Sequence, residues 1–185
     1  MIGSRGWLAG LKRRSDLEVQ LPLMRERARV QLEDFTKDPL SARLVPVLKA
    51  IRPHVSGTFL DVGFCTGIAY NYLCDIVDYH GIDDWALAAE VAKEFYGDHF
   101  EVCDVMQYTK QHDYVFCAQL APQFEWTWEH FKHVKSLAKK GLIIADKTVT
   151  KEMHVGAEII PGPDVTTAIW RVEGSILGLG IAYRA

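Results

Sequence analysis

The stretch TFLDVGFCTGIAYNYL, residues 58–73, decides the fold of this chain. It opens with an apolar run, interrupted by Asp61, that predicts a buried strand. A turn with glycines at Gly63 and Gly67 follows, and the residues after the turn predict a helix. In an open parallel sheet, ligands gather at the carboxyl ends of the strands. The turn after this strand is therefore the first candidate for a binding site.

The alternation of strand and helix continues along the chain. Two strand-like runs around Gly174 predict a C-terminal antiparallel hairpin. Because strands separated by helices pair in parallel through right-handed crossovers, we expect a doubly wound, mostly parallel sheet with helices on both faces. The further strands are expected at 79–83, 99–104, 112–118 and 142–146, and a long helix is expected to end at Lys139, Lys140 and Gly141.

The composition indicates one domain. A chain of 185 residues that is 49% hydrophobic and 24% charged can fill one core but is short for two. We expect residues 1–54 to form a helical extension that closes over the pocket, and residues 55–185 to form a single α/β domain. The apolar stretches are too short to cross a membrane and no secretory signal is visible, so we expect no membrane association.

The cysteines indicate a reducing environment. Cys65, Cys74, Cys103 and Cys117 form no C-x-x-C pair and fall inside apolar runs, which is typical of buried reduced thiols. Histidines at 130 and 133 are expected on the polar face of the long helix rather than at a metal ion. We therefore predict a cytoplasmic protein without a metal site.

The charge is distributed unevenly. Residues 1–55 carry 11 Lys or Arg against 6 Asp or Glu, whereas the remainder carries 10 against 18. A basic segment with Arg25, Arg27 and Arg29 on an acidic body could bind RNA or another anionic partner. Because these arginines alternate with acidic residues, an ordinary solvated helix face is the favoured interpretation.

Two phosphate-binding interpretations of the glycine turn fail. A P-loop needs Gly-Lys followed by Ser or Thr, and none is present. The dinucleotide fingerprint would need glycines at 63, 65 and 68, where the chain has Cys65 and Ile68 at the last two. The order Asp61, Gly63, Cys65, Gly67 instead resembles motif I of the class I S-adenosylmethionine-dependent methyltransferases. The likeness covers about residues 55–150 and implies their Rossmann-like fold with a seven-stranded sheet.

The resemblance also implies a cofactor site for S-adenosylmethionine. Asp61 would favour the ammonium of the cofactor, although it could instead serve only to clamp the backbone amides of the turn. Asp83 would take the two ribose hydroxyls and Asp84 would cap the next helix. Trp85 could cover the adenosine or belong to the core. The full expected set is Asp61, Gly63, Phe64, Cys65, Gly67, Asp83, Asp84, Trp85, Asp104, Val105 and Cys117, with Asp104 and Val105 beside the adenine.

The sequence does not identify a catalytic group or the methyl acceptor. A methyl sulfonium is already activated, so alignment of the acceptor matters more than a general base. Gln119, Asp146 and Lys147 are the candidates near the expected acceptor. Lys147 and Glu173 loosely resemble part of the Lys-Asp-Lys-Glu set of RNA ribose 2′-O-methyltransferases, but Gln119 stands where an aspartate is expected. We predict a methyltransferase for a small molecule or a protein side chain rather than duplex DNA; the alternatives are an RNA ribose methyltransferase and a non-catalytic cofactor-binding protein.

Overall fold

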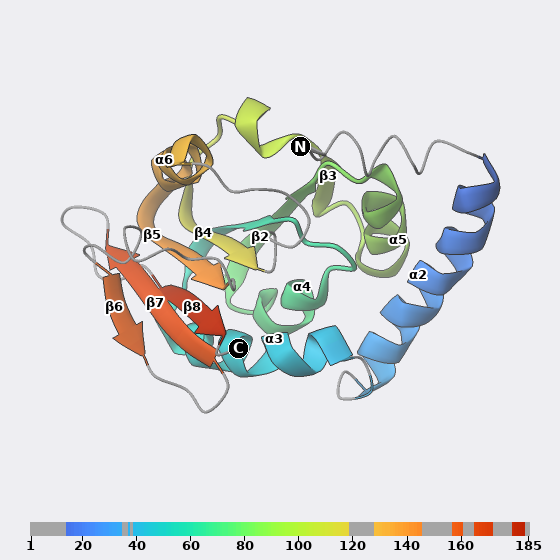
Figure 1. Cartoon of the computed structure of the whole chain (residues 1–185), viewed down its shortest axis with the longest axis horizontal. Helices are drawn as coiled ribbons and strands as arrows, with labels where there is room; N and C mark the ends of the chain where they lie inside the picture. Colours follow the sequence, from blue (N-terminus) through green and yellow to red (C-terminus); the bar gives the residue numbers. More distant parts are fainter. Residues whose placement is uncertain are drawn as a thin grey trace.

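The computed structural model describes residues 14–34, 37, 39–118, 128–145, 157–160, 165–171 and 179–183. These residues form a central sheet with helices around it (Figure 1). The helices are α2 (Arg14–Asp34), α3 (Pro39–Ile51), α4 (Ile68–Leu73), α5 (Ala86–Tyr96) and α6 (Trp128–Leu137), with short 3₁₀ turns η2 (Arg52–His54) and η3 (Val105–Gln107). The strands are β1 (Gly57–Val62), β2 (Val77–Asp83), β3 (Phe100–Val102), β4 (His112–Ala118), β5 (Ala138–Ala145), β6 (Ala157–Ile160), β7 (Val165–Arg171) and β8 (Leu179–Tyr183).

The strand order is β3-β2-β1-β4-β5-β7-β6-β8. The first five strands in this order pair in parallel, as expected for helical crossovers. Strand order reverses beside β1, because its neighbours are β2 on one side and β4 on the other. The carboxyl end of β1, where the glycine turn begins, is therefore at the topological switch point of the sheet.

The strand count differs from the expected seven, since the described residues form a sheet of eight strands. One of them, β6, lies where the sequence predicted no strand. Strand β7 runs antiparallel to β5 and to β8. The residues that would join β7 to β8 in a hairpin lie outside the described part of the chain, so the hairpin itself stays a prediction.

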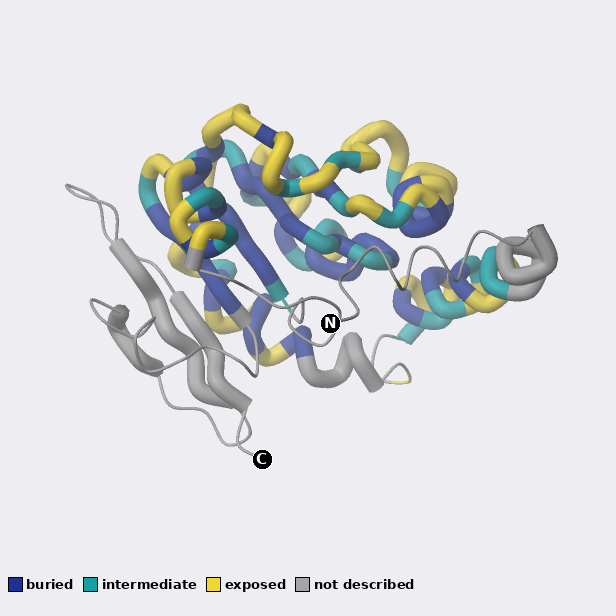
Figure 2. The backbone as a smooth tube through the Cα atoms, turned by 45° about the horizontal axis from the view of Figure 1, so that its top comes forward, coloured by how far each residue is buried: buried dark blue, intermediate teal, exposed yellow. Residues whose placement is uncertain are grey.

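Each face of the sheet has its own core. Phe59 in β1 belongs to a cluster that also contains buried side chains of α2, α3, α4 and α5. The next residue, Leu60, belongs to a second cluster with Phe131, Val134 and Leu137 of α6. Figure 2 shows the central strands as buried along most of their length. Burial on both faces explains the apolar runs within β1 and β4, the two strands at the centre of the parallel part of the sheet.

Two local expectations were wrong. Lys139, Lys140 and Gly141 do not end the long helix, because α6 ends at Leu137 and β5 begins at Ala138. Lys140 instead lies 3.3 Å from Asp113 of β4, an ion pair that a helix assignment could not reveal. The cysteines are not all buried either, since Cys74 is exposed.

The N-terminal helix α2 packs on the α/β body. It lies beside α5 (Figure 1) and also contacts α4. Its Met24 and Ala28 are buried in the same core cluster as residues of those helices. The division into residues 1–54 and 55–185 stays a prediction. Within the described residues, no helix has both the length and the apolar character needed to cross a membrane.

Candidate functional site

The turn after β1 has an unusual backbone. Its first residue, Gly63, donates its N–H to the carbonyl of Ile82 at 2.8 Å, which ties the turn to β2. Gly63 and Gly67 have φ angles of 74° and 78°, and Cys65 between them has a φ of 53°. These are left-handed values that side chains with a Cβ rarely adopt. Cys65, which stands where the family usually has glycine, therefore occupies a position whose conformation favours glycine.

The space next to Gly67 is occupied by side chains of the protein itself. A Cβ at this position would lie 2.9 Å from the ring of Tyr96 and 3.0 Å from the ring of Phe100. Phe64 of the same turn also packs on Phe100, with ring centroids 4.7 Å apart, and it is 3% exposed. The turn is thus held by aromatic packing beneath it, and the side chain of Phe64 lies in the core.

Asp83, at the end of β2, clamps the turn. One carboxylate oxygen accepts the N–H of Cys65 at 3.0 Å, and the other accepts the N–H of Trp85 at 2.9 Å. Burial raises the pKa of Asp83 to about 6, against the lowering effect of these two hydrogen bonds. The clamping role that the sequence offered for Asp61 is therefore filled by Asp83.

Asp61 is buried within β1, with 3% of its surface exposed. The hydroxyl of Tyr79, which is also buried, donates a hydrogen bond to its carboxylate. Burial raises the pKa of Asp61 to about 7; the hydrogen bond from Tyr79 lowers it and the negative charge of Asp83 raises it further. The tyrosine is a partner that sequence reasoning missed, although Tyr79 is two residues before Gly81, which faces Asp61 across the β1–β2 pair.

Replacing Tyr79 by phenylalanine is expected to destabilise the protein by about 1–3 kcal/mol, because the buried Asp61 carboxylate loses its donor. Urea denaturation at pH 8 measures this free energy. Tyr96→Phe is the matched control, since the Tyr96 hydroxyl meets Asn71 at an exposed site and its loss should cost within about 0.5 kcal/mol. Equal costs for the two variants would contradict the assigned Tyr79–Asp61 interaction.

Asp84 and Asp104 extend the acidic group toward the surface. Asp84 is exposed, and burial followed by the negative charge of Asp104 raises its pKa. Asp104 follows β3 and accepts the N–H of Met106 at 2.9 Å. The carboxylates of Asp61, Asp83, Asp84 and Asp104 thus influence one another in succession, and they come from the ends of three adjacent strands.

The expectation that Asp84 caps the next helix was wrong. Helix α5 begins at Ala86 with Trp85 in the cap position, and no side chain caps it. The N–H of Trp85 is bound by Asp83 instead. Trp85 is half-buried and packs against the core cluster that includes side chains of α5. Its side chain therefore belongs in part to the core.

The remaining expected residues divide into two groups. Cys117 is 1% exposed in the core beneath α6, and Val105 packs partly buried against the same core. The imidazole of His133 on α6 lies 2.8 Å from the carbonyl oxygen of Val105, and this contact holds η3 against the helix.

Gln119, Asp146 and Lys147 lie outside the described residues. In the part of the chain that the structure describes, no three His, Cys, Asp or Glu residues are grouped as a metal site would need.

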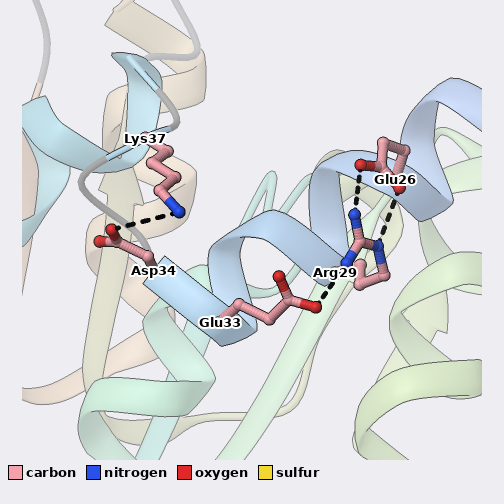
Figure 3. A network of polar contacts seen from close by, with 5 residues as sticks. All are labelled: Glu26, Arg29, Glu33, Asp34 and Lys37. Atoms are coloured by element: carbon pink, nitrogen blue, oxygen red, sulfur yellow. Dashed lines mark hydrogen bonds and ion pairs between the residues drawn. The ribbon is translucent and has the colours of Figure 1, made fainter.

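Two arginines of α2, Arg25 and Arg29, are paired with acidic side chains. Arg29 bonds to Glu26 and Glu33 on its own helix, and Lys37 lies 3.8 Å from Asp34 (Figure 3). Arg25 bonds to Glu94 of α5 at 2.6 Å. This pairing favours the interpretation of α2 as a solvated helix face over that of a basic surface for RNA. RNA binding stays an untested prediction.

Solved structures resemble this chain, although no protein-family model and no curated protein matches its sequence. One is magnesium protoporphyrin IX methyltransferase (ChlM) from Synechocystis PCC 6803 with bound S-adenosylmethionine. Its sequence is 16% identical, the match covers 82% of this chain and 85% of that chain, and the TM-score is 0.55. The same enzyme with bound S-adenosylhomocysteine is 15% identical, with 82% of this chain and 88% of that chain covered and a TM-score of 0.56. A candidate S-adenosyl-L-methionine-dependent methyltransferase from Methanococcus maripaludis is 14% identical, with 70% of this chain and 66% of that chain covered and a TM-score of 0.54. At these identities the likeness concerns architecture, and this chain has the fold of the class I S-adenosylmethionine-dependent methyltransferases.

Proposed function

We propose that this protein is an S-adenosylmethionine-dependent methyltransferase that acts on a small molecule or an accessible protein side chain. The observation that carries the proposal is the succession of carboxylates from the ends of β1, β2 and β3 beside a left-handed turn at the switch point of the sheet. A nucleoside that bears an ammonium offers hydrogen-bond donors and positive charge, which suit such an acidic edge. The fold shared with cofactor-bound methyltransferases supports the same cofactor.

Asp83 is the proposed partner of the ribose. A carboxylate has about four acceptor positions. The N–H groups of Cys65 and Trp85 take two of them, so two are left for the two ribose hydroxyls. The pKa of about 6 leaves the carboxylate mostly ionised at neutral pH, as an acceptor of two hydroxyl protons must be.

The other acids have separate proposed roles. Asp104, after β3, is the partner for the adenine amino group, and Val105 lies beside the ring. Asp61 acts on the cofactor ammonium through the field of its charge, because its burial prevents direct contact from outside the turn. Gly63, Cys65 and Gly67 shape the turn against which the methionine end would lie.

The bound cofactor would supply an activated methyl group on a sulfonium, so the protein needs only to hold the acceptor in line with it. Gln119, Asp146 and Lys147 are the proposed acceptor-side residues. The Synechocystis enzyme is, by its name, a methyltransferase for magnesium protoporphyrin IX, a small molecule, which supports a small-molecule acceptor here. Matched arginines on α2 make RNA a weaker candidate.

Calorimetric titration with S-adenosylmethionine and S-adenosylhomocysteine tests the proposal. Both ligands should bind, and Asp83→Ala should weaken both by about 10- to 100-fold, because the ribose hydroxyls lose a charged acceptor. Asp78 is an exposed aspartate at the opposite end of β2, so Asp78→Ala should leave the affinity for both ligands unchanged. If neither ligand binds the wild-type protein at millimolar concentration, the proposed function is wrong.

Transfer itself needs a second measurement. The protein is incubated with S-adenosylmethionine carrying a labelled methyl group and with metabolite, protein and RNA fractions, and label is followed by mass spectrometry. Label in the metabolite or protein fraction supports the proposed acceptor class. Label in RNA would favour the ribose methyltransferase, and cofactor binding without transfer to any fraction would favour a non-catalytic binding protein.

A further inference from the structure

Helix α2 contacts the glycine turn through polar side chains as well as through the core. Four of its residues, Met24, Arg27, Ala28 and Gln31, follow helical spacing on one face. Met24, Ala28 and Gln31 are buried, and Arg27 is half-buried. The apolar pair belongs to the core, and both polar side chains are aimed at the turn that follows β1.

A buried hydrogen bond holds this contact. The Thr66 hydroxyl donates to the side-chain oxygen of Gln31 at 2.6 Å, and both residues are almost fully buried. The ion pair between Arg25 and Glu94 adds a second attachment, to α5. The face of α2 is thereby fixed over Cys65 and Thr66, the middle of the turn.

Arg27 brings a positive charge to an otherwise acidic place. Its guanidinium nitrogen Nη1 lies 4.0 Å from the sulfur of Cys65. Asp83 accepts the N–H of the same Cys65, and its carboxyl group interacts with those of Asp61 and Asp84. Carboxylates at such an edge suit an ammonium and hydroxyls, but they repel the carboxylate that the methionine end of the cofactor also carries. Helix α4 spans only six residues, so its dipole offers little compensation.

We propose that Arg27 binds the carboxylate of the methionine end of S-adenosylmethionine, while the Gln31–Thr66 hydrogen bond positions α2 so that it can do so. The inference rests on the proposed function and assigns to the N-terminal helix a binding role at the cofactor site. Arginine suits this role because its planar guanidinium can give two parallel hydrogen bonds to one carboxylate. The glycine turn would then lie between the acids that take the ammonium and the cation that takes the carboxylate.

Two ligands that differ only in that carboxylate test the proposal. The probes are S-adenosylmethionine and decarboxylated S-adenosylmethionine, which keeps the ammonium, the sulfonium and the adenosine. Arg27→Gln should weaken the first by about 10- to 100-fold and the second by no more than about twofold, as measured by calorimetric titration. Arg27→Lys keeps the charge without the fork and should lose less affinity for S-adenosylmethionine than Arg27→Gln.

Controls separate binding from structure. Arg29→Gln, on the same helix but paired with Glu26 and Glu33, should change neither affinity. Gln31→Ala should weaken S-adenosylmethionine more than its decarboxylated form, because α2 loses its attachment to Thr66. Equal losses for both ligands in Arg27→Gln would mean a purely structural role, and no loss for S-adenosylmethionine would place the carboxylate elsewhere; either result overturns this inference and leaves the proposed function intact. If the wild-type protein binds neither ligand, both fail.

Discussion

Replacing Gly67 by alanine is expected to destabilise the native protein by about 2–5 kcal/mol. Two effects add. The left-handed backbone at a φ of 78° costs an alanine about 1–2 kcal/mol. The new methyl group would also lie 2.9 Å from Tyr96 and 3.0 Å from Phe100, and forcing it into this packing costs about 1–3 kcal/mol. Urea denaturation measures the sum.

A double-mutant cycle separates these two costs. Removing the ring in Tyr96→Ala relieves one close contact and leaves the backbone conformation of residue 67 as it was. Gly67→Ala combined with Tyr96→Ala should therefore be less destabilised than the sum of the single changes, by about 0.5–3 kcal/mol. Strict additivity would show that the aromatic neighbours do not require the glycine. A loss below about 1 kcal/mol for Gly67→Ala alone would contradict the left-handed assignment as well.

The sequence was most informative where both faces of a strand are buried. Strand β4 runs from His112 to Ala118, as expected, because the apolar run that follows Asp113 fits a central parallel strand. The acidic residues that end β1 and β2 could likewise be located, since a carboxylate that closes an apolar run must lie at or near the sheet edge. The parallel pairing followed from the intervening helices.

The roles inside the turn could not be read from the same pattern. A pattern of glycines shows which residues need space or a positive φ, but it does not show what fills the space. Phe64 was expected at the cofactor, yet its ring packs at a tilt against Phe100, which comes from a strand more than thirty residues later. The signal was present in the residue itself, because a phenylalanine in an exposed ligand turn would leave a large apolar surface in water.

The different roles of Asp61 and Asp83 depended on strand register. Both Asp61 and Asp83 are acids at strand ends, and only the pairing of β1 with β2 decides which of them reaches the turn amides. Asp83 does so, and Asp61 meets Tyr79 instead. Both carboxylates are held in an environment that raises their pKa values, and such groups gather at functional sites because burying a charge is otherwise unfavourable.

The second large effect concerns Asp61. At pH 8, Asp61→Asn is expected to stabilise the ligand-free protein by up to about 4 kcal/mol, because a neutral amide avoids the cost of a buried charge. The asparagine oxygen can still accept the hydrogen bond from Tyr79. The pKa of Asp61 is about 7 in the folded protein against 3.8 for an ordinary aspartate, so its contribution to stability is present at low pH and is lost as the pH rises through 7.

The pH dependence of the wild-type protein follows from three groups whose pKa values are shifted by burial. Asp61 and Asp83, with raised pKa values of about 7 and about 6, favour the folded state as the pH falls from 8 to 5, by about 3 and about 1 kcal/mol. His112 opposes them, because burial lowers its pKa to about 4 and its neutral form stabilises the fold only at higher pH, a loss of about 2 kcal/mol at pH 5. The two carboxyls outweigh the imidazole.

The free energy of unfolding should therefore rise by about 2 kcal/mol between pH 8 and pH 5, where many proteins are already losing stability. Urea denaturation at unit steps of pH measures the curve. Asp61→Asn should remove the rise, because the Asp61 contribution exceeds the net gain, and His112→Gln should make the rise steeper by removing the opposing group. A wild-type stability that falls steadily over this range, or an Asp61→Asn curve parallel to it, would contradict the buried ionisation of Asp61.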